Sequence, residues 1–177
     1  MKWFLFFLSF IIVSCTGSQK TATGIYLDGI YKDKQLKYRI GKLDKNWKLL
    51  SVKSVNLAFY NNINNGIIYI TGKCKNSSDA PLFILRTHLL IGFKDKKFLK
   101  SEKLTIEDRE ALNSIIIAKL DGVKRKINYF VLKKDGCLYD LVLISPIEYF
   151  NSNNREFLEL IKNFKIIKGS NIKVFLD

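Results

Sequence analysis

Apolar and polar residues alternate along most of the chain, which is the pattern of strands that bury one face. In the first half, the alternation predicts a strand over residues 36–40 and a short strand before it over residues 25–27. Trp47 follows a predicted turn and is expected to fill one end of the core. Residues 55–59 and 67–72 predict a hairpin around an asparagine-rich loop, because asparagine and glycine favour turn conformations.

The second half carries four longer segments with strand character. They lie at residues 97–106, 110–120, 126–133 and 137–145. The Asp135-Gly136 pair between the last two is a strong hairpin signal, since both residues tolerate the positive φ of a tight turn. Because consecutive strands joined by short turns usually pair, the four segments predict an antiparallel meander.

Two segments have helical periodicity instead. Asp79 is expected to cap the first helix with Pro81 in its first turn, and apolar residues follow at helical spacing at Leu82, Leu85, Leu89 and Phe93. The second helix is expected to open at Ser145-Pro146, to be interrupted by residues 151–154, and to end before a short edge strand or a loose tail. Its apolar stripe is Ile147, Phe150, Phe157, Leu158, Ile161 and Phe164.

These elements together predict the fold class. Both helical stripes are expected to be buried against the strands, because an amphipathic element is stable when its apolar face is covered. The expected fold is therefore α+β, with a twisted, mostly antiparallel β-sheet flanked by helices in an α/β/α sandwich.

The first 15 residues follow a different pattern, with Lys2, an unbroken apolar run from Trp3 to Val13, then Ser14 and Cys15. The run is too short to span a bilayer as a helix, which needs about 20 residues, and its layout is that of a secretory signal. Residues 12–15 (Ile-Val-Ser-Cys) resemble a lipobox. The resemblance implies cleavage before Cys15 and a diacylglyceryl thioether on its sulfur. An ordinary cleaved signal with an incidental cysteine and a buried N-terminal helix are the alternatives.

The predicted organisation has three parts. Residues 1–14 are the lipoprotein signal peptide, residues 15–24 a lipidated flexible tether of small and polar residues, and residues 25–177 a single globular domain. The domain is expected to stand off a lipid bilayer to which the acylated Cys15 binds. Thr16 follows Cys15 at the position where Asp retains lipoproteins in the inner membrane of some enteric bacteria. We therefore expect attachment to the outer membrane, facing the periplasm.

The chain is strongly basic, with 30 Lys and Arg against 16 Asp and Glu and a formal net charge of +14. Removal of the signal takes away only Lys2 and leaves about +13, a field that favours an anionic partner. The lysine excess has a second explanation, because the chain is rich in Lys, Ile, Asn and Phe together, the residues that AT-rich codons supply. The cations are scattered rather than grouped in an arginine-rich block, so nucleic acid is not an expected partner.

With Cys15 lipidated, Cys74 and Cys137 remain, and two interpretations stay open. The pair either closes a disulfide in the oxidising envelope, around a loop of about 60 residues, or forms two separate buried side chains. The sequence favours the second interpretation, because Cys74 ends a predicted strand and Cys137 follows a turn, which requires no proximity.

The sequence contains no recognisable catalytic or metal motif. The single histidine, His88, has no acidic residue or cysteine at helical spacing, so a solvated or core-edge position is expected. Glu107, Asp108 and Glu110 surround a turn with Arg109, and we expect a solvated turn rather than an acid pair or a cation site. We therefore expect no enzyme activity, no metal and no cofactor. A small hydrolase would require His88 and these carboxylates in one pocket.

Several aromatic and apolar positions occur in a familiar succession. They are Tyr38-Arg-Ile40, Asn46-Trp47, Val55-Asn-Leu-Ala-Phe59, the apolar helix after Asp79, and Phe157-Leu-x-x-Ile161-x-Asn-Phe164, within residues 36–166. This succession resembles the PsbP-like family, which includes the extrinsic photosystem II subunit PsbP and small bacterial lipoproteins, and whose fold is shared by a yeast Ran-binding import factor. The resemblance implies a non-enzymatic domain that binds or stabilises larger assemblies. The family's metal-binding and photosystem-docking residues have no matching pattern here, so none is carried over.

The expected function is that of a membrane-anchored envelope lipoprotein, a non-enzymatic binding or assembly accessory with a protein partner in the envelope. The alternative is an electrostatic binder of anionic envelope polymer or lipid head groups, which the net positive charge favours. Oligomeric state does not follow from the sequence.

Overall fold

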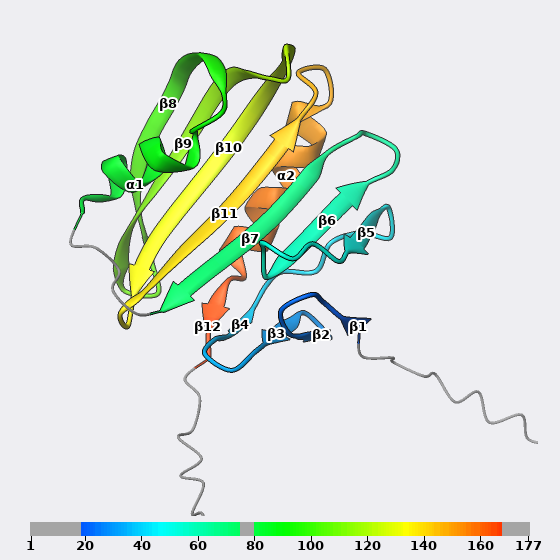
Figure 1. Ribbon diagram of the computed structural model, residues 1–177, viewed down its shortest axis with the longest axis vertical. Helices are drawn as coiled ribbons and strands as arrows, with labels where there is room; N and C mark the ends of the chain where they lie inside the picture. The colour runs from blue at the N-terminus through cyan, green and yellow to red at the C-terminus, as the bar shows by residue number, and fades with distance from the viewer. Residues whose placement is uncertain (1–18, 75–79, 168–177) are drawn as a thin grey trace, which may run out of the picture.

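The computed structural model describes residues 19–74 and 80–167. Cys15, the predicted signal and the predicted helix cap Asp79 lie outside the described residues. Two antiparallel sheets and two helices make up the described chain, in the α+β class that the sequence predicts. Figure 1 shows the larger sheet running along the length of the molecule and the smaller sheet near one end.

Seven strands form the larger sheet, in the order β5-β6-β7-β11-β10-β9-β8. Their bounds are β5 (Trp47–Leu50), β6 (Leu57–Asn61), β7 (Ile67–Cys74), β8 (Lys94–Ile106), β9 (Arg109–Leu120), β10 (Val123–Lys134) and β11 (Cys137–Ser145). Every neighbouring pair is antiparallel. The predicted meander is confirmed in β8 to β11, and β7 joins it by pairing with β11, which lies more than 60 residues further along the chain.

The strands of the meander are joined by two-residue turns in which both residues have positive φ. These are Glu107-Asp108 (54° and 59°), Asp121-Gly122 (49° and 80°) and Asp135-Gly136 (52° and 72°). Turns of this kind match the right-handed twist of the strands that they connect. The predicted hairpin at Asp135-Gly136 is therefore confirmed.

Five short strands form the smaller sheet, in the order β1-β2-β3-β4-β12. Their bounds are β1 (Gln19–Lys20), β2 (Ile25–Leu27), β3 (Ile30–Lys32), β4 (Lys37–Arg39) and β12 (Lys165–Ile166). Residues 19–24, the last part of the predicted tether, take part in this sheet, because β1 pairs with β2 and the Thr23 hydroxyl lies 2.8 Å from the Tyr31 hydroxyl. An edge strand is held by backbone hydrogen bonds and needs no apolar period, so its sequence looks like a tether.

The first helix, α1 (Leu82–Leu89), is shorter than the sequence predicts. The expected stripe continues to Phe93, but the helix ends at Leu89 with Leu90 as its C-cap, and Gly92 with φ of 94° directs the chain into β8. Glycine adopts this left-handed conformation without the steric cost that a side chain would bring. Phe93 still packs, half-buried, against the core beside α1.

The second helix, α2 (Phe150–Lys162), is not interrupted by its asparagines. Asn153 is fully buried within it, and its Nδ2 amide donates a hydrogen bond to Ser145 Oγ at 2.9 Å. The predicted stripe is also partly wrong, because Ile147 and Leu158 are 44% and 43% exposed, whereas Leu160 is buried. A buried polar residue with a hydrogen-bond partner outside the helix breaks the simple apolar period of the helix.

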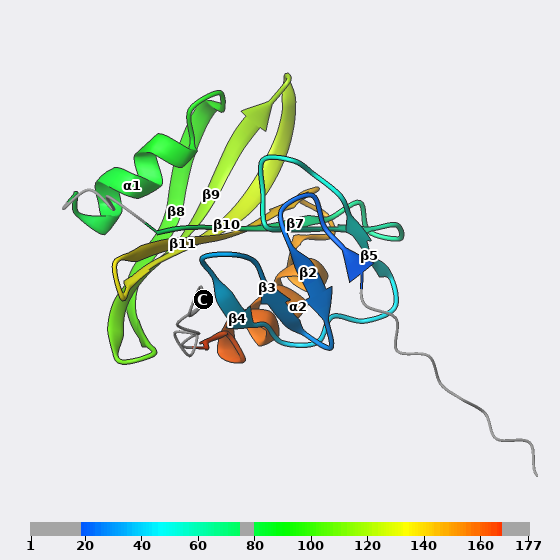
Figure 2. The ribbon, with the colours of Figure 1, turned by 60° about the horizontal axis from the view of Figure 1, so that its bottom comes forward.

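The two helices cover opposite faces of the larger sheet, as Figure 2 shows. Along β10, Phe130 and Leu132 belong to the core cluster that contains α2, and Tyr129 and Val131 to the cluster beside α1. The smaller sheet adds Tyr31 and other residues to the α2 face, so that this face has the larger core. The flanking helices are thus observed, with unequal cover on the two faces of the sheet.

Candidate functional site

A hollow of about 440 Å³ lies between the smaller sheet and the edge strand β5 of the larger one. Most of its lining is aromatic or aliphatic, and its polar side chains are two lysines and a glutamine. The lining residues are Gln19, Tyr26, Lys42, Leu43, Trp47, Lys48, Leu49 and Phe59. Polar and apolar atoms share the exposed surface of the hollow about equally, so it can take a ligand that is apolar in part and polar in part.

Trp47 forms the firmest part of this wall. The turn before it is closed by Asp44, whose Oδ1 accepts a hydrogen bond from the Asn46 backbone N–H at 2.7 Å. The Trp47 indole Nε1–H donates to Glu156 Oε2 on α2 at 2.8 Å, and the side chain is only 6% exposed. The expectation that Trp47 fills one end of the core is confirmed, and the same ring is preorganised to line the hollow.

Tyr26 and Phe59 hold the two sheets together across the hollow. Their ring centroids are 5.6 Å apart and the rings meet edge to face at 74°, a favourable aromatic geometry. Burial raises the pKa of the Tyr26 phenol, and the nearby Asp28 carboxylate raises it further. The phenol is therefore neutral at physiological pH and retains its hydroxyl proton for a hydrogen bond.

The two lysines give the hollow its charge. Lys42 and Lys48 are both exposed, and none of the eight lining residues is acidic. The site therefore suits a partner that presents an apolar group together with a negative charge. Only Trp47 of these lining residues is recognisable from the sequence, because the others come from separate elements and converge only in the folded chain.

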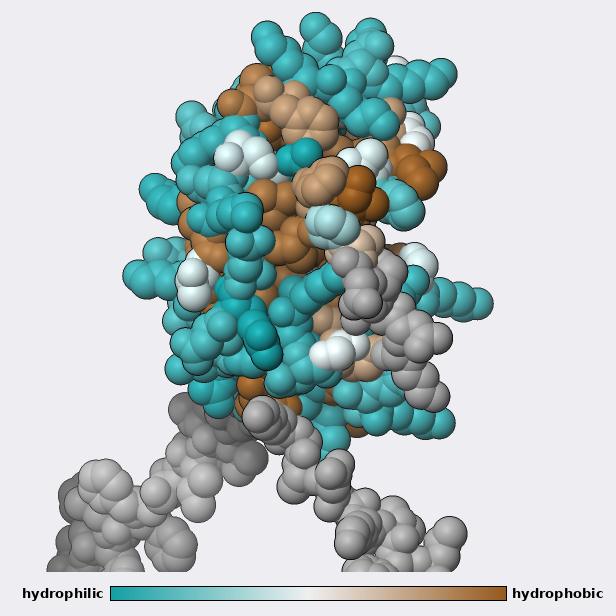
Figure 3. Space-filling view, turned by 90° about the vertical axis from the view of Figure 1, so that its left-hand side faces the viewer, coloured by the Kyte–Doolittle hydropathy of each residue, from teal (hydrophilic) through white to brown (hydrophobic). Residues whose placement is uncertain are grey.

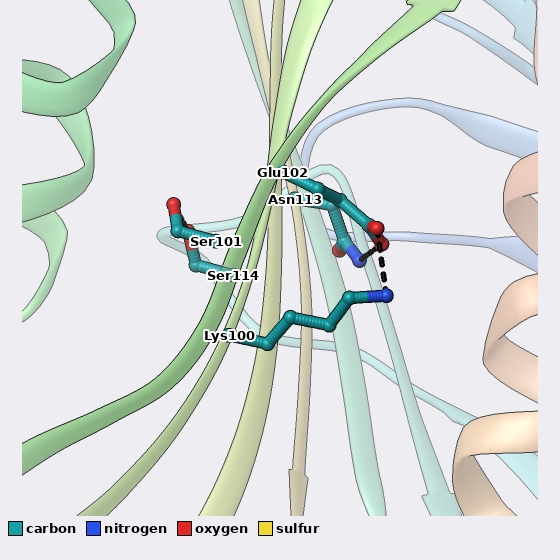
Figure 4. Close-up of polar contacts among 5 residues, drawn as sticks. All are labelled: Lys100, Ser101, Glu102, Asn113 and Ser114. Carbon is teal, nitrogen blue, oxygen red and sulfur yellow. Dashed lines mark hydrogen bonds and ion pairs between the residues drawn. The ribbon is translucent and has the colours of Figure 1, made fainter.

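A second polar cluster lies beneath α1. The Arg86 guanidinium donates to Ser101 Oγ at 2.9 Å and to Ser114 Oγ at 3.1 Å, and its Cζ lies 4.3 Å from the Phe98 ring centroid. Figure 4 shows the two serines on one side of the β8–β9 pair, with Glu102, Asn113 and the end of Lys100 on the other. Both hydroxyls accept from a cation instead of facing a general base, so this arrangement stabilises α1 rather than activating a nucleophile.

Asp140 is the buried carboxylate on the same face. It accepts hydrogen bonds from the Tyr129 hydroxyl and, at 3.3 Å, from Thr71 Oγ1. Burial raises the pKa of Asp140, while these hydrogen bonds and the charge of Lys73 lower it in part. Burial also raises the pKa of Tyr129, and the Asp140 charge adds to that shift. Asp140 and Tyr129 lie within the larger sheet and do not line the hollow.

The structure joins Cys74 and Cys137 in a disulfide. The two residues face each other directly in the β7–β11 register, with their Cα atoms 4.1 Å apart. The sequence favours two separate cysteines instead. A local pattern cannot show that β7 pairs with β11, because the two strands are far apart in the sequence. The bridge links the end of β7 to the beginning of β11.

The other residues considered from sequence lie apart from the hollow. His88 is exposed on α1, Glu107 pairs with Lys134 at 3.1 Å, and Glu110 pairs with Lys103 at 2.9 Å. Within residues 19–74 and 80–167, no group of three or more His, Cys, Asp or Glu side chains is placed to hold a metal ion. No helix in the same ranges is long and apolar enough to cross a membrane.

No protein-family model and no curated protein sequence matches the chain. Solved structures match its fold. Cyanobacterial PsbP (CyanoP) from Synechocystis sp. PCC 6803 is 12% identical, with a TM-score of 0.60 over 78% of this chain and 91% of that chain. LpqN of Mycobacterium tuberculosis, described as involved in cell envelope biogenesis, is 10% identical, with a TM-score of 0.57 over 76% and 87%.

These similarities define an α+β domain built on a mostly antiparallel sheet. The domain has a PsbP-like fold, as the succession of aromatic and apolar positions in the sequence predicts.

Proposed function

We propose that this chain is an envelope lipoprotein, anchored through an acylated Cys15, whose domain is a non-enzymatic accessory that binds a protein partner through the hollow between the two sheets. The outer membrane, on its periplasmic side, is the proposed location. The similarity in fold to LpqN, described as involved in cell envelope biogenesis, supports the envelope as the compartment.

The composition of the hollow is the observation that carries the proposal. Its lining has an aromatic wall and two lysines, but no serine, cysteine, histidine or carboxylate. A nucleophilic lysine needs a desolvated site, and both Lys42 and Lys48 are exposed. The lining can therefore offer apolar contact and positive charge, which are the means of binding, without an evident acid, base or nucleophile.

The anchor is tested by replacing Cys15 with Ala. The variant should take up no fatty-acid probe, because the thiol is the acceptor, and it should be unprocessed or absent from the detergent phase. Wild-type protein and the Cys74→Ala/Cys137→Ala variant should both take up the probe. Labelling of the Cys15→Ala variant would contradict the anchor.

The hollow is tested with two neighbouring leucines of β5. Leu49 lines the hollow, whereas Leu50 lies on the other side of the strand and is 40% exposed. If a partner docks in the hollow, Leu49→Ala should reduce its capture from solubilised envelopes about tenfold, equivalent to a loss of ~1.4 kcal/mol, and Leu50→Ala should not. Denaturation midpoints of both variants show whether the fold is intact.

Salt distinguishes this docking from attraction by charge alone. The Debye length falls from about 10 Å at 0.1 M to about 3 Å at 1 M, so binding that rests on the net positive charge weakens steeply. Contact with the aromatic wall should survive. A partner lost at 1 M salt, or captured equally by Leu49→Ala and wild type, contradicts docking in the hollow.

A further inference from the structure

Register sorts the side chains of the smaller sheet onto two faces, because directly opposed residues share a face. One row runs across the sheet through Gln19, Tyr26, Tyr31, Tyr38 and Ile166. Tyr31 and Tyr38 are fully buried, and Tyr26 and Ile166 pack half-buried against the same core. This row is the inner face of the sheet.

The opposite rows form the outer face, which carries two kinds of side chain only. The register places five cations there, Lys20, Lys32, Lys37, Arg39 and Lys165. Between them lie the apolar residues Ile25, Leu27 and Ile30. Ile25 and Leu27 are 50% and 38% exposed. We call these eight residues the basic face, and none of them is acidic.

Two carboxylates lie near the basic face, and both are in turns at its ends. Asp33 Oδ2 accepts a hydrogen bond from the Tyr31 hydroxyl at 2.9 Å, and its Oδ1 accepts from the backbone N–H of Gln35 and of Leu36, each at 2.7 Å. Its charge is thus committed to the β3–β4 turn. Asp28 occupies the β2–β3 turn with φ of 48°. Five cations against these two carboxylates leave the face net positive.

We propose that the basic face rests on an anionic lipid bilayer. The inference depends on the proposed acylation of Cys15, which precedes β1 by four residues. Four extended residues span at most about 14 Å, so the anchor would keep β1 and its sheet next to the bilayer surface. Lysines near such a surface are attracted by anionic head groups, and a single lipid attachment is reinforced by a basic patch.

The mixture of side chains favours a bilayer over an acidic protein. Long basic side chains reach the head groups while their aliphatic stems stay on the apolar side. Ile25, Leu27 and Ile30 are interspersed among the cations, as on surfaces that settle into the head-group region.

The experiment uses the acylated full chain in vesicles that contain a lipid-borne quencher. A fluorophore is attached to Ile25→Cys on the basic face or to Val123→Cys, where β10 begins at the far end of the molecule (Figure 1). The two positions are matched, with exposures of 50% and 51%. In vesicles with phosphatidylglycerol the Ile25 label should be quenched at least threefold more than the Val123 label. In phosphatidylcholine alone, or at 1 M salt, the difference should shrink.

Charge reversal separates the face from the net charge of the chain. Lys32→Glu/Lys37→Glu should remove most of the quenching at position 25, while Lys97→Glu/Lys124→Glu, which changes the net charge equally at exposed sites elsewhere, should not. Equal quenching at positions 25 and 123, or quenching at 25 that requires an added envelope protein, overturns the proposal.

Flotation of the same samples reports on the anchor independently. Protein that floats with vesicles without quenching at position 25 keeps the anchor and overturns the orientation. Protein that does not float contradicts the anchor, and the face is then tested by adding excess anionic vesicles. Quenching at position 25 supports the basic face in that case, and its absence overturns it.

Discussion

The two faces of the larger sheet are packed in different ways. On the α2 face, Tyr38, Tyr139 and Phe164 meet with ring centroids 5.6 to 6.2 Å apart, and each is at most 2% exposed. On the α1 face, Phe83 and Ile91 are 54% and 77% exposed. Figure 3 views the molecule from the side of α1 and β8, and apolar side chains appear at its surface.

The difference follows from what covers each face. The α2 face is closed by a 13-residue helix and by strands from both ends of the described chain. The α1 face is covered by an eight-residue helix and includes polar groups in its interior, namely Arg86 with two serines and Asp140 with Tyr129. We expect the α2 face to supply most of the stability and the α1 face to supply most of its dependence on pH.

The largest expected effect is that of Phe164→Ala on the α2 face. Phe164 is 2% exposed and joins Tyr38 of the smaller sheet to Tyr139 of the larger one. Its removal should leave a cavity that costs about 3–5 kcal/mol in the free energy of unfolding. Urea denaturation measures this cost, and Lys162→Ala on the exposed side of α2 should change it by less than about 0.5 kcal/mol. Similar midpoints for the two variants would contradict the packing.

The antiparallel meander is the part of the fold that could be predicted from the sequence. The meander from β8 to β11 follows from alternation and from turn residues such as Asp135-Gly136, since each hairpin is specified by adjacent residues. Burial of Asn153 depends on Ser145 and on the Asn64 carbonyl, and the disulfide depends on the β7–β11 pairing. The Asn64 contact and the disulfide join segments far apart in the sequence, and the Ser145 contact joins the helix to the end of β11, so a helical or strand period contains no trace of them.

The hollow could be predicted from the sequence only in part. Trp47 is recognisable as a core aromatic, but Gln19, Lys42 and Phe59 reach the same hollow from separate elements. Their convergence results from the docking of the smaller sheet, which begins with β1, a strand that reads as a tether. The site could be predicted only after the two sheets had been placed together.

A matched pair of leucines measures the contrast between the helices. Leu160 on α2 is fully buried, whereas Leu85 on α1 is only half-buried beside the second core cluster. Leu160→Ala should cost about 2–5 kcal/mol and Leu85→Ala about 1 kcal/mol, because the shallower site loses less apolar burial and leaves a smaller cavity. Both costs are obtained from urea unfolding curves with a common slope. Equal costs would show that α1 is packed as firmly as α2.

The smallest expected effect is a change in pH dependence at Asp140. Burial raises the pKa of this carboxyl above its ordinary value of about 4, so the folded protein favours its protonated form. Its contribution to stability is fully present below the ordinary pKa and is lost as the pH rises through the raised value. Asp140→Asn is neutral throughout. The stability of the wild type relative to this variant should therefore increase as the pH falls from 7 to 4, measured by urea unfolding at each pH.

Asp95→Asn provides a control of opposite sign for the Asp140 experiment. A hydrogen bond from Lys119 lowers the pKa of the exposed Asp95 carboxyl, so the wild type should keep its stability relative to this variant down to about pH 4 and lose it as the pH falls further. The two variants differ in the cause of the shift, because burial acts at Asp140 and an ion pair acts at Asp95. A pH-independent difference between wild type and Asp140→Asn would contradict the raised pKa that burial gives the carboxyl on the α1 face.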